Sequence, residues 1–166
     1  LVAWHGELAQ SPGQRRATIV QAARGLAPRT IIGLPKQPIT VVPKPDRYVF
    51  DIDPAVLAAH LKGVLAAEHG LQALDRGQTY LTGPHSIDDA ALACFEVAEV
   101  LPLETRKLSR LLADRGIGQL EIKKRGVAIE PERLRRDLKL RGDNAATLLV
   151  AQVNGRSVAI LAHRVG

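Results

Sequence analysis

An Asn-Gly dipeptide at positions 154 and 155 joins two strongly apolar runs near the end of this 166-residue sequence. A two-residue type I′ turn needs positive φ at both central positions, which Asn and Gly adopt at low cost. The dipeptide therefore predicts a β-hairpin between Ala146–Val153 and Ser157–His163. Both runs are apolar on both faces, which is typical of strands in the centre of a sheet.

The segments before this hairpin alternate between strand and helix patterns. Apolar residues recur with the period of a strand or of a helix in turn. They predict a strand at Phe95–Val100, a helix at Glu104–Arg115, a strand at Gly118–Lys124 and a helix at Pro131–Lys139. The expected fold class is α/β, a mixed sheet with the order β-α-β-α-β-β and right-handed crossovers.

The N-terminal third is predicted to consist of short strands. Leu1–Leu8 and Ala17–Ala22 flank a turn-rich stretch and indicate a hairpin, and Thr30–Leu34 and Pro38–Val42 are further β-like runs. Five of the ten prolines lie between positions 28 and 45, which excludes a helix there and indicates edge strands or a linker. A lone hairpin is only marginally stable, so we expect it at the edge of a sheet from a missing domain.

A helix is expected from Pro54 to the residue before Gly70. Asp53 can cap it, Pro54 suits its first position, and Gly70 is a typical helix end. His60 falls on its apolar stripe and is interpreted as a packed histidine. The segment Gly83–Asp89 is predicted to be a turn followed by a short helix.

Composition limits the class of protein. No run approaches the roughly 20 apolar residues of a membrane span. Cys94 is the only cysteine, so the chain can form neither an internal disulfide nor a cysteine zinc cluster, in keeping with a cytoplasmic location. The sequence has no methionine and starts with Leu1. We therefore expect it to be a fragment of a longer protein.

Charge is unevenly distributed along the chain. Residues 1–102 hold 9 Lys and Arg against 10 Asp and Glu, a net charge of −1, whereas residues 103–166 hold 14 against 7, a net charge of +7. A basic excess in one segment indicates either a polyanionic partner or a solvated face.

Motifs of catalysis and cofactor binding are missing from the sequence. Gly116-Ile117-Gly118 is the nearest approach to a phosphate loop, but it follows a predicted helix and precedes a strand, the reverse of the required order. The five histidines are scattered. The sequence therefore predicts no catalytic, cofactor or metal site in this chain.

A cluster of basic residues is the one constellation that suggests a ligand. Several long cations on one surface can neutralise nucleic-acid phosphates without reading sequence. Because aromatic residues make up only 3% of the chain, a base-stacking platform is excluded. The candidate RNA-binding residues lie on the predicted helices and at strand ends: Arg106, Lys107, Arg110, Lys123, Lys124, Arg125, Arg135, Arg136, Lys139 and Arg141. The alternative is a solvated basic face.

Phe95 to Val165 resembles the THUMP-like domain that ends a group of bacterial class I methyltransferases. The resemblance rests on Glu99-Val100-Leu101-Pro102, Gly116-Ile117-Gly118 and the following strand to Gly126, Leu140 to Asn144, and the closing hairpin. Upstream, Asp51 to Val56 resembles the connecting region of those proteins. Leu1–Ala22 resembles the last strands of their Rossmann-like sheet.

This resemblance implies a parent protein that binds S-adenosylmethionine and methylates a substrate. RNA is the expected substrate, since THUMP domains bind tRNA. It divides the chain into the end of a truncated methyltransferase domain (1–45), a helical connecting region (46–94) and a THUMP-like domain (95–166). The cofactor loop would precede Leu1, so the chain alone is expected to be inactive. We expect it to hold RNA for the parent's methyltransferase domain. The alternative is a structural module that packs on that domain, or forms a homodimer, without binding RNA.

Overall fold

The computed structural model describes residues 11–20, 27–77 and 80–166. No helix in these ranges is long and apolar enough to cross a membrane. Along the chain the elements are β1 (Arg15–Ile19), β2 (Arg29–Gly33), β3 (Tyr48–Ile52), α1 (Pro54–Ala58), α2 (Lys62–His69), β4 (Gln72–Ala73), β5 (Tyr80–Gly83), β6 (Leu92–Pro102), α3 (Thr105–Asp114), β7 (Ile117–Lys124), α4 (Pro131–Leu138), β8 (Asn144–Val153) and β9 (Arg156–Val165).

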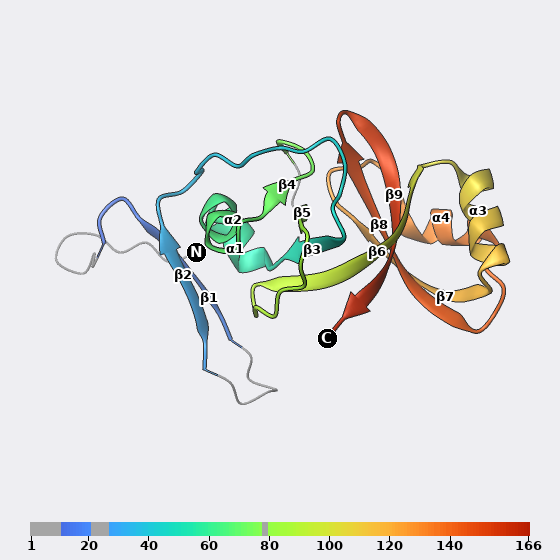
Figure 1. Cartoon of the computed structure of the whole chain (residues 1–166), viewed down its shortest axis with the longest axis horizontal. Helices are drawn as coiled ribbons and strands as arrows, with labels where there is room; N and C mark the ends of the chain where they lie inside the picture. The colour runs from blue at the N-terminus through green and yellow to red at the C-terminus, as the bar shows by residue number, and fades with distance from the viewer. Residues whose placement is uncertain (1–10, 21–26, 78–79) are drawn as a thin grey trace.

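Seven strands form one mixed sheet in the order β4-β5-β3-β6-β9-β8-β7. Strands β7 and β8 are parallel, and the other neighbours are antiparallel. The long strand β6 pairs with β3 near its start and with β9 from Cys94 onward, so it joins the two halves of the molecule (Figure 1). The mixed α/β class and the β-α-β-α-β-β order from β6 to β9 are both confirmed.

The predicted C-terminal hairpin is also confirmed. Val153 pairs with Arg156, and the intervening Asn154 and Gly155 have φ of 49° and 73°. These values suit a type I′ turn. Strands β8 and β9 each have a neighbour on both sides in the sheet, as their apolar faces indicated.

Apolar side chains of the C-terminal half are buried on both faces of the sheet. We call the face covered by α3 and α4 the helix side (Figure 1). Its buried residues include Leu108, Leu112, Leu134 and Leu138 from the helices and Leu120, Leu148, Val150 and Leu161 from the strands. The opposite side buries Val49, Tyr80, Phe95, Leu149 and Ile160. Alternation along each strand sends successive residues to different sides.

The predicted helix from Pro54 is wrong in one respect, because it is two helices. The amide of Leu61 donates to the Val56 carbonyl across 3.0 Å while His60 has φ of 56°, the pattern of a left-handed helix end. The His60 carbonyl then accepts from the Lys36 amide at 2.9 Å. His60 is exposed rather than packed. A tertiary hydrogen bond thus accompanies a break that periodicity did not indicate.

One further prediction differs from the structure, and another falls outside the described residues. Strand β1 pairs with β2. The predicted hairpin with Leu1–Leu8 involves residues that lie outside the described ranges. The segment from 84 to 89 contains bends and extended chain and no helix. The short helix predicted within Gly83–Asp89 is therefore wrong. Strands β1 and β2 pack Ala17, Ile19 and Ile31 into the same apolar cluster as residues of β3 and α1, across the expected boundary at residue 45.

A charged cluster fastens β2 to the rest of this half. Arg29 contacts both Glu68 and Asp89, at 2.5 and 3.0 Å, and Asp89 also accepts from His69 at 2.9 Å. Burial raises the pKa of Asp89, but hydrogen bonds from the Ala91 amide, His69 and Arg29 outweigh it, so the pKa lies below its ordinary value of 3.8. The carboxylate thereby joins β2 and α2 to the segment that precedes β6.

We expect Asp89→Asn to lower stability most at neutral pH. A carboxyl whose folded pKa is depressed contributes stability above its unfolded pKa and loses it as pH falls through the folded value. The difference in unfolding free energy between wild type and variant should therefore shrink as pH falls below about 4. Urea titrations of both proteins at pH 7 and pH 3 measure this difference in unfolding free energy. An equal difference at the two pH values would contradict a depressed pKa for Asp89.

Candidate nucleic-acid interface

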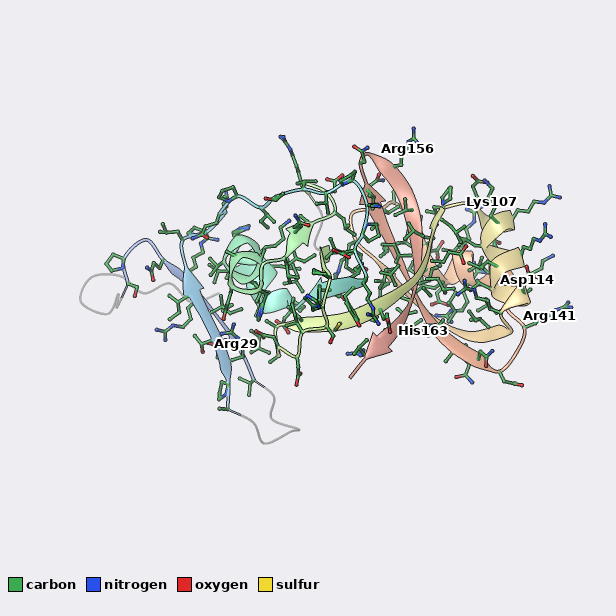
Figure 2. All side chains as sticks on the ribbon, in the orientation of Figure 1. Arg29, Lys107, Asp114, Arg141, Arg156 and His163 are labelled. Atoms are coloured by element: carbon green, nitrogen blue, oxygen red, sulfur yellow. The ribbon has the colours of Figure 1, made fainter. Side chains whose placement is uncertain are left out.

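The helix side carries eight of the ten predicted RNA-binding residues. They project from α3, from α4 and from the ends of the segments that flank them, and in Figure 2 Lys107 and Arg141 point outward at this end of the molecule. The eight residues are Arg106, Lys107, Arg110, Lys124, Arg135, Arg136, Lys139 and Arg141.

Helix α3 presents three of these cations because its leucines face the sheet. Leu108 and Leu112 are buried, and Gly116, with φ of 61°, follows its C-terminal end. On the outer side Lys107 pairs with Glu104 at 2.9 Å and Arg110 with Asp114 at 3.9 Å. Exposed pairs of this spacing contribute only about 0.2–0.5 kcal/mol, so these cations can exchange partners readily.

Helix α4 likewise buries two leucines, Leu134 and Leu138, against the sheet. Arg135 donates from its guanidinium to the Leu120 carbonyl at 2.5 Å, which ties α4 to β7. Lys124 donates to the Ile129 carbonyl at 2.7 Å in the loop before the helix. These two cations therefore have structural contacts as well as charge.

Four of the eight helix-side cations make neither an ion pair nor a side-chain hydrogen bond to the described residues. Their side chains are exposed. They are Arg106, Arg136, Lys139 and Arg141. Long, unpaired cations on one side of a domain can neutralise phosphates without first breaking contacts within the protein.

Lys123 and Arg125 do not belong to this surface. Both lie on the opposite side of the sheet, where Arg125 contacts Asp51 of β3 at 3.0 Å and Lys123 contacts it at 3.4 Å. The Asp51 side chain is only 8% exposed. Lys123 and Arg125 therefore cannot share one phosphate-binding face with Lys124, because strand alternation separates them from it.

The sequence did not predict Asp51 as the partner of these two cations. Asp51 lies within a buried strand and is separated from Lys123 by 72 residues. An acidic residue amid buried apolar neighbours is rarely tolerated without a counter-charge. The sequence Tyr-Val-Phe-Asp-Ile in β3 was therefore a signal that a cation packs there.

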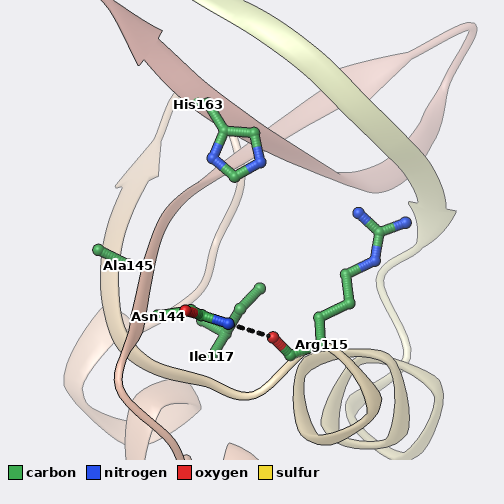
Figure 3. Close-up of a pocket in the computed structure, with 5 residues that line it drawn as sticks. All are labelled: Arg115, Ile117, Asn144, Ala145 and His163. Carbon is green, nitrogen blue, oxygen red and sulfur yellow. Dashed lines mark hydrogen bonds between the residues drawn. The ribbon is translucent and has the colours of Figure 1, made fainter.

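A small pocket of about 320 Å³ lies where α3 ends and β7 and β8 begin (Figure 3). Asn144 donates from its amide to the Arg115 carbonyl at 2.8 Å, and the Arg115 guanidinium contacts Glu99. His163 projects toward the same space from β9. None of these pocket residues was predicted, and no sequence motif connects them. Arg115 and His163 give this pocket two potential hydrogen-bonding groups.

The glycines of Gly116-Ile117-Gly118 serve backbone packing in the structure. Gly116 ends α3, and a Cβ on Gly118 would lie 1.8 Å from the Gly142 carbonyl oxygen. Gly118 and Gly142 therefore allow two backbone segments to touch. Within the described ranges no group of three or more His, Cys, Asp or Glu side chains could hold a metal ion.

Residues 92–164 match the family described as THUMP domain-like. This segment is a THUMP-like domain. The match spans β6 to β9 and so includes the helix-side cations and the small pocket.

The chain is also similar to longer proteins. It is 34% identical over 156 residues to an uncharacterized S-adenosylmethionine-dependent methyltransferase of Mycobacterium tuberculosis, in both strain CDC 1551 / Oshkosh and strain H37Rv. This similarity covers 94% of the chain but 41% of each relative. The chain thus spans about two fifths of their length.

One solved structure shares the fold. The crystal structure of a “putative methyltransferase from Porphyromonas gingivalis W83” superposes with a TM-score of 0.70 and 22% sequence identity. The superposition covers 85% of this chain and 35% of the other. The arrangement of strands and helices around the THUMP-like domain therefore occurs in a second, distant protein.

Proposed function

We propose that this chain is an accessory region of an S-adenosylmethionine-dependent methyltransferase and that the helix side of its THUMP-like domain holds an RNA substrate. The methyltransferase part is supported by the relatives that match 94% of the chain. The RNA part rests on the four exposed, unpaired cations of the described helix side, Arg106, Arg136, Lys139 and Arg141.

The chemistry of this face favours recognition of phosphate and shape. No Phe, Tyr or Trp occurs between Phe95 and the C-terminus, so this segment offers no platform of such rings on which bases could stack. Guanidinium groups donate in a planar fork that matches phosphate oxygens. The face would therefore bind structured RNA through its backbone, with little preference for sequence.

The remainder of the longer protein would supply the chemistry. S-adenosylmethionine donates the methyl group when bound, and the glycines described here are occupied in backbone packing. In this proposal the THUMP-like domain contributes affinity and positioning, and residues outside this chain carry the transfer itself. A cytoplasmic location and tRNA as the RNA class belong to the same proposal.

We expect the variant Arg136→Ala/Arg141→Ala to bind structured RNA about tenfold more weakly than wild type, and by the same factor for RNAs of unrelated sequence. The matched control is Arg15→Ala/Lys44→Ala, which removes two exposed cations outside the THUMP-like domain. Fluorescence anisotropy with tRNA and an unrelated hairpin measures both. Equal loss in the two variants would count against the helix side as the RNA surface.

A second candidate is a module that packs on the catalytic domain without touching RNA. One end of the β1–β2 sheet favours it, because Ile32 and the adjoining Leu34 are 41% and 55% exposed while Ile31 is buried. Neighbouring exposed apolar side chains of this kind can mark an interface. If Ile32→Ser/Leu34→Ser disrupted domain packing in the longer protein and wild type bound no RNA, this candidate would replace the first.

A further inference from the structure

A groove of about 900 Å³ lies outside the THUMP-like domain, beside the edge strand β4. One wall is the segment from Lys36 to Val41, whose Val41 forms a parallel bridge with Ala73 of β4. The other wall is the junction of α1 and α2. Its apolar lining includes Pro38, Ile39, Val41, Leu57 and Ala73.

Positive charge is concentrated in this groove. Lys36, Lys62 and Arg76 line it together with His60, and Asp75 is the single acidic residue among the lining residues. The fixed charge of the lining is therefore +2, although residues 1–102 as a whole carry −1. Burial lowers the pKa of Lys62, while Asp75 acts in the opposite sense. The groove thus combines an apolar lining with a local basic excess.

The walls of the groove are held by close backbone contacts. Lys36 and His60 both adopt left-handed φ, 61° and 56°, and the Lys36 amide donates to the His60 carbonyl at 2.9 Å. At the start of α2 a Cβ on Gly63 would lie 2.4 Å from the Gln37 carbonyl oxygen. Left-handed backbone at non-glycine residues costs free energy, and here the contact between the walls maintains it. The groove is therefore formed before any ligand arrives.

We propose that this groove binds a nucleotide, with its phosphate at the Lys36, Lys62 and Arg76 side chains and its base against the apolar lining. A volume of 900 Å³ accommodates a mononucleotide, since small-ligand sites measure about 300–1,000 Å³. The cations supply charge-assisted hydrogen bonds to phosphate oxygens. The ligand is either a free nucleotide or one unit of an RNA strand. The proposal is independent of the helix-side face.

Calorimetric titrations of the full chain with AMP, ATP, inorganic phosphate and a short single-stranded oligoribonucleotide test this site. The groove variant is Lys36→Asn/Arg76→Ala, because asparagine tolerates the left-handed backbone at position 36. We expect it to bind its nucleotide probe at least tenfold more weakly than wild type, at an unchanged melting temperature. Arg15→Ala/Lys44→Ala again removes two cations elsewhere and should bind like wild type.

The probes distinguish the two sources of the nucleotide. Binding of AMP or ATP identifies a free nucleotide, whereas binding of the oligoribonucleotide alone identifies a unit of RNA. The helix-side variant Arg136→Ala/Arg141→Ala should retain AMP binding, so failure of one site is separable from failure of the other. The proposal is overturned if no probe binds, if inorganic phosphate binds as tightly as AMP, or if the groove variant binds like wild type.

Discussion

Replacing Gly118 with alanine should destabilise the chain by about 3 kcal/mol or more. A Cβ at this position would lie 1.8 Å from the Gly142 carbonyl oxygen and 2.7 Å from its carbonyl carbon. Both are backbone atoms, so no side chain can rotate away. Relief requires the start of β7 and the loop before β8 to move apart, and that movement disturbs the parallel β7–β8 pairing.

Gly77→Ala is the matched control for this substitution. Gly77 has no positive φ, and a Cβ on it would lie 4.0 Å from an Asp75 carboxylate oxygen, which is an ordinary contact distance. Its stability should remain within about 0.5 kcal/mol of wild type. Urea denaturation of the two variants measures the contrast. A Gly118→Ala protein within 1 kcal/mol of wild type would show that the backbone contact is looser than described.

Removing both cations that contact Asp51 should cost about 3–5 kcal/mol. In Lys123→Ala/Arg125→Ala the Asp51 carboxylate, 8% exposed, would be left in the sheet interior without the two counter-charges it contacts. Asp51→Asn should cost less, because Lys123 and Arg125 are 28% and 35% exposed and can turn toward water. The double cation variant is expected to lose more stability than Asp51→Asn because the anion is buried and the two cations are partly exposed.

The triple variant Asp51→Asn/Lys123→Ala/Arg125→Ala makes this prediction specific. Replacing the stranded carboxylate with a neutral amide should recover most of the stability lost in the double cation variant. Thermal and urea denaturation of the three variants provide the comparison. If the triple variant were as unstable as the double variant, the loss would come from the packing of the Lys and Arg stems and not from the buried charge.

Local chemistry was enough to predict the C-terminal half of the fold. The Asn154-Gly155 turn, the helix end at Gly116 and the inward leucines of α3 and α4 each depend on residues a few positions apart. The N-terminal half depends more on distant contacts. The break between α1 and α2 involves a hydrogen bond from Lys36 to His60, 24 residues away, which periodicity cannot reveal.

The candidate interface was predicted only in part, because local periodicity indicates which face of an element a residue occupies but not which distant residue it contacts. Helical periodicity correctly placed the α3 and α4 cations away from the leucines. Strand periodicity could also have separated Lys123 and Arg125 from Lys124, because consecutive strand residues face opposite sides. Their contact with Asp51 required the tertiary structure, since β3 and β7 are far apart in both sequence and strand order.

The salt dependence of tRNA binding tests the central proposal most directly. Each phosphate contact contributes about −0.7 to −0.9 to the slope of log K against log salt. The variant Arg136→Ala/Arg141→Ala should therefore flatten the slope by about one to two units, whereas Arg15→Ala/Lys44→Ala should leave it unchanged. Identical slopes for wild type and the folded helix-side variant would show that these cations form only a solvated face.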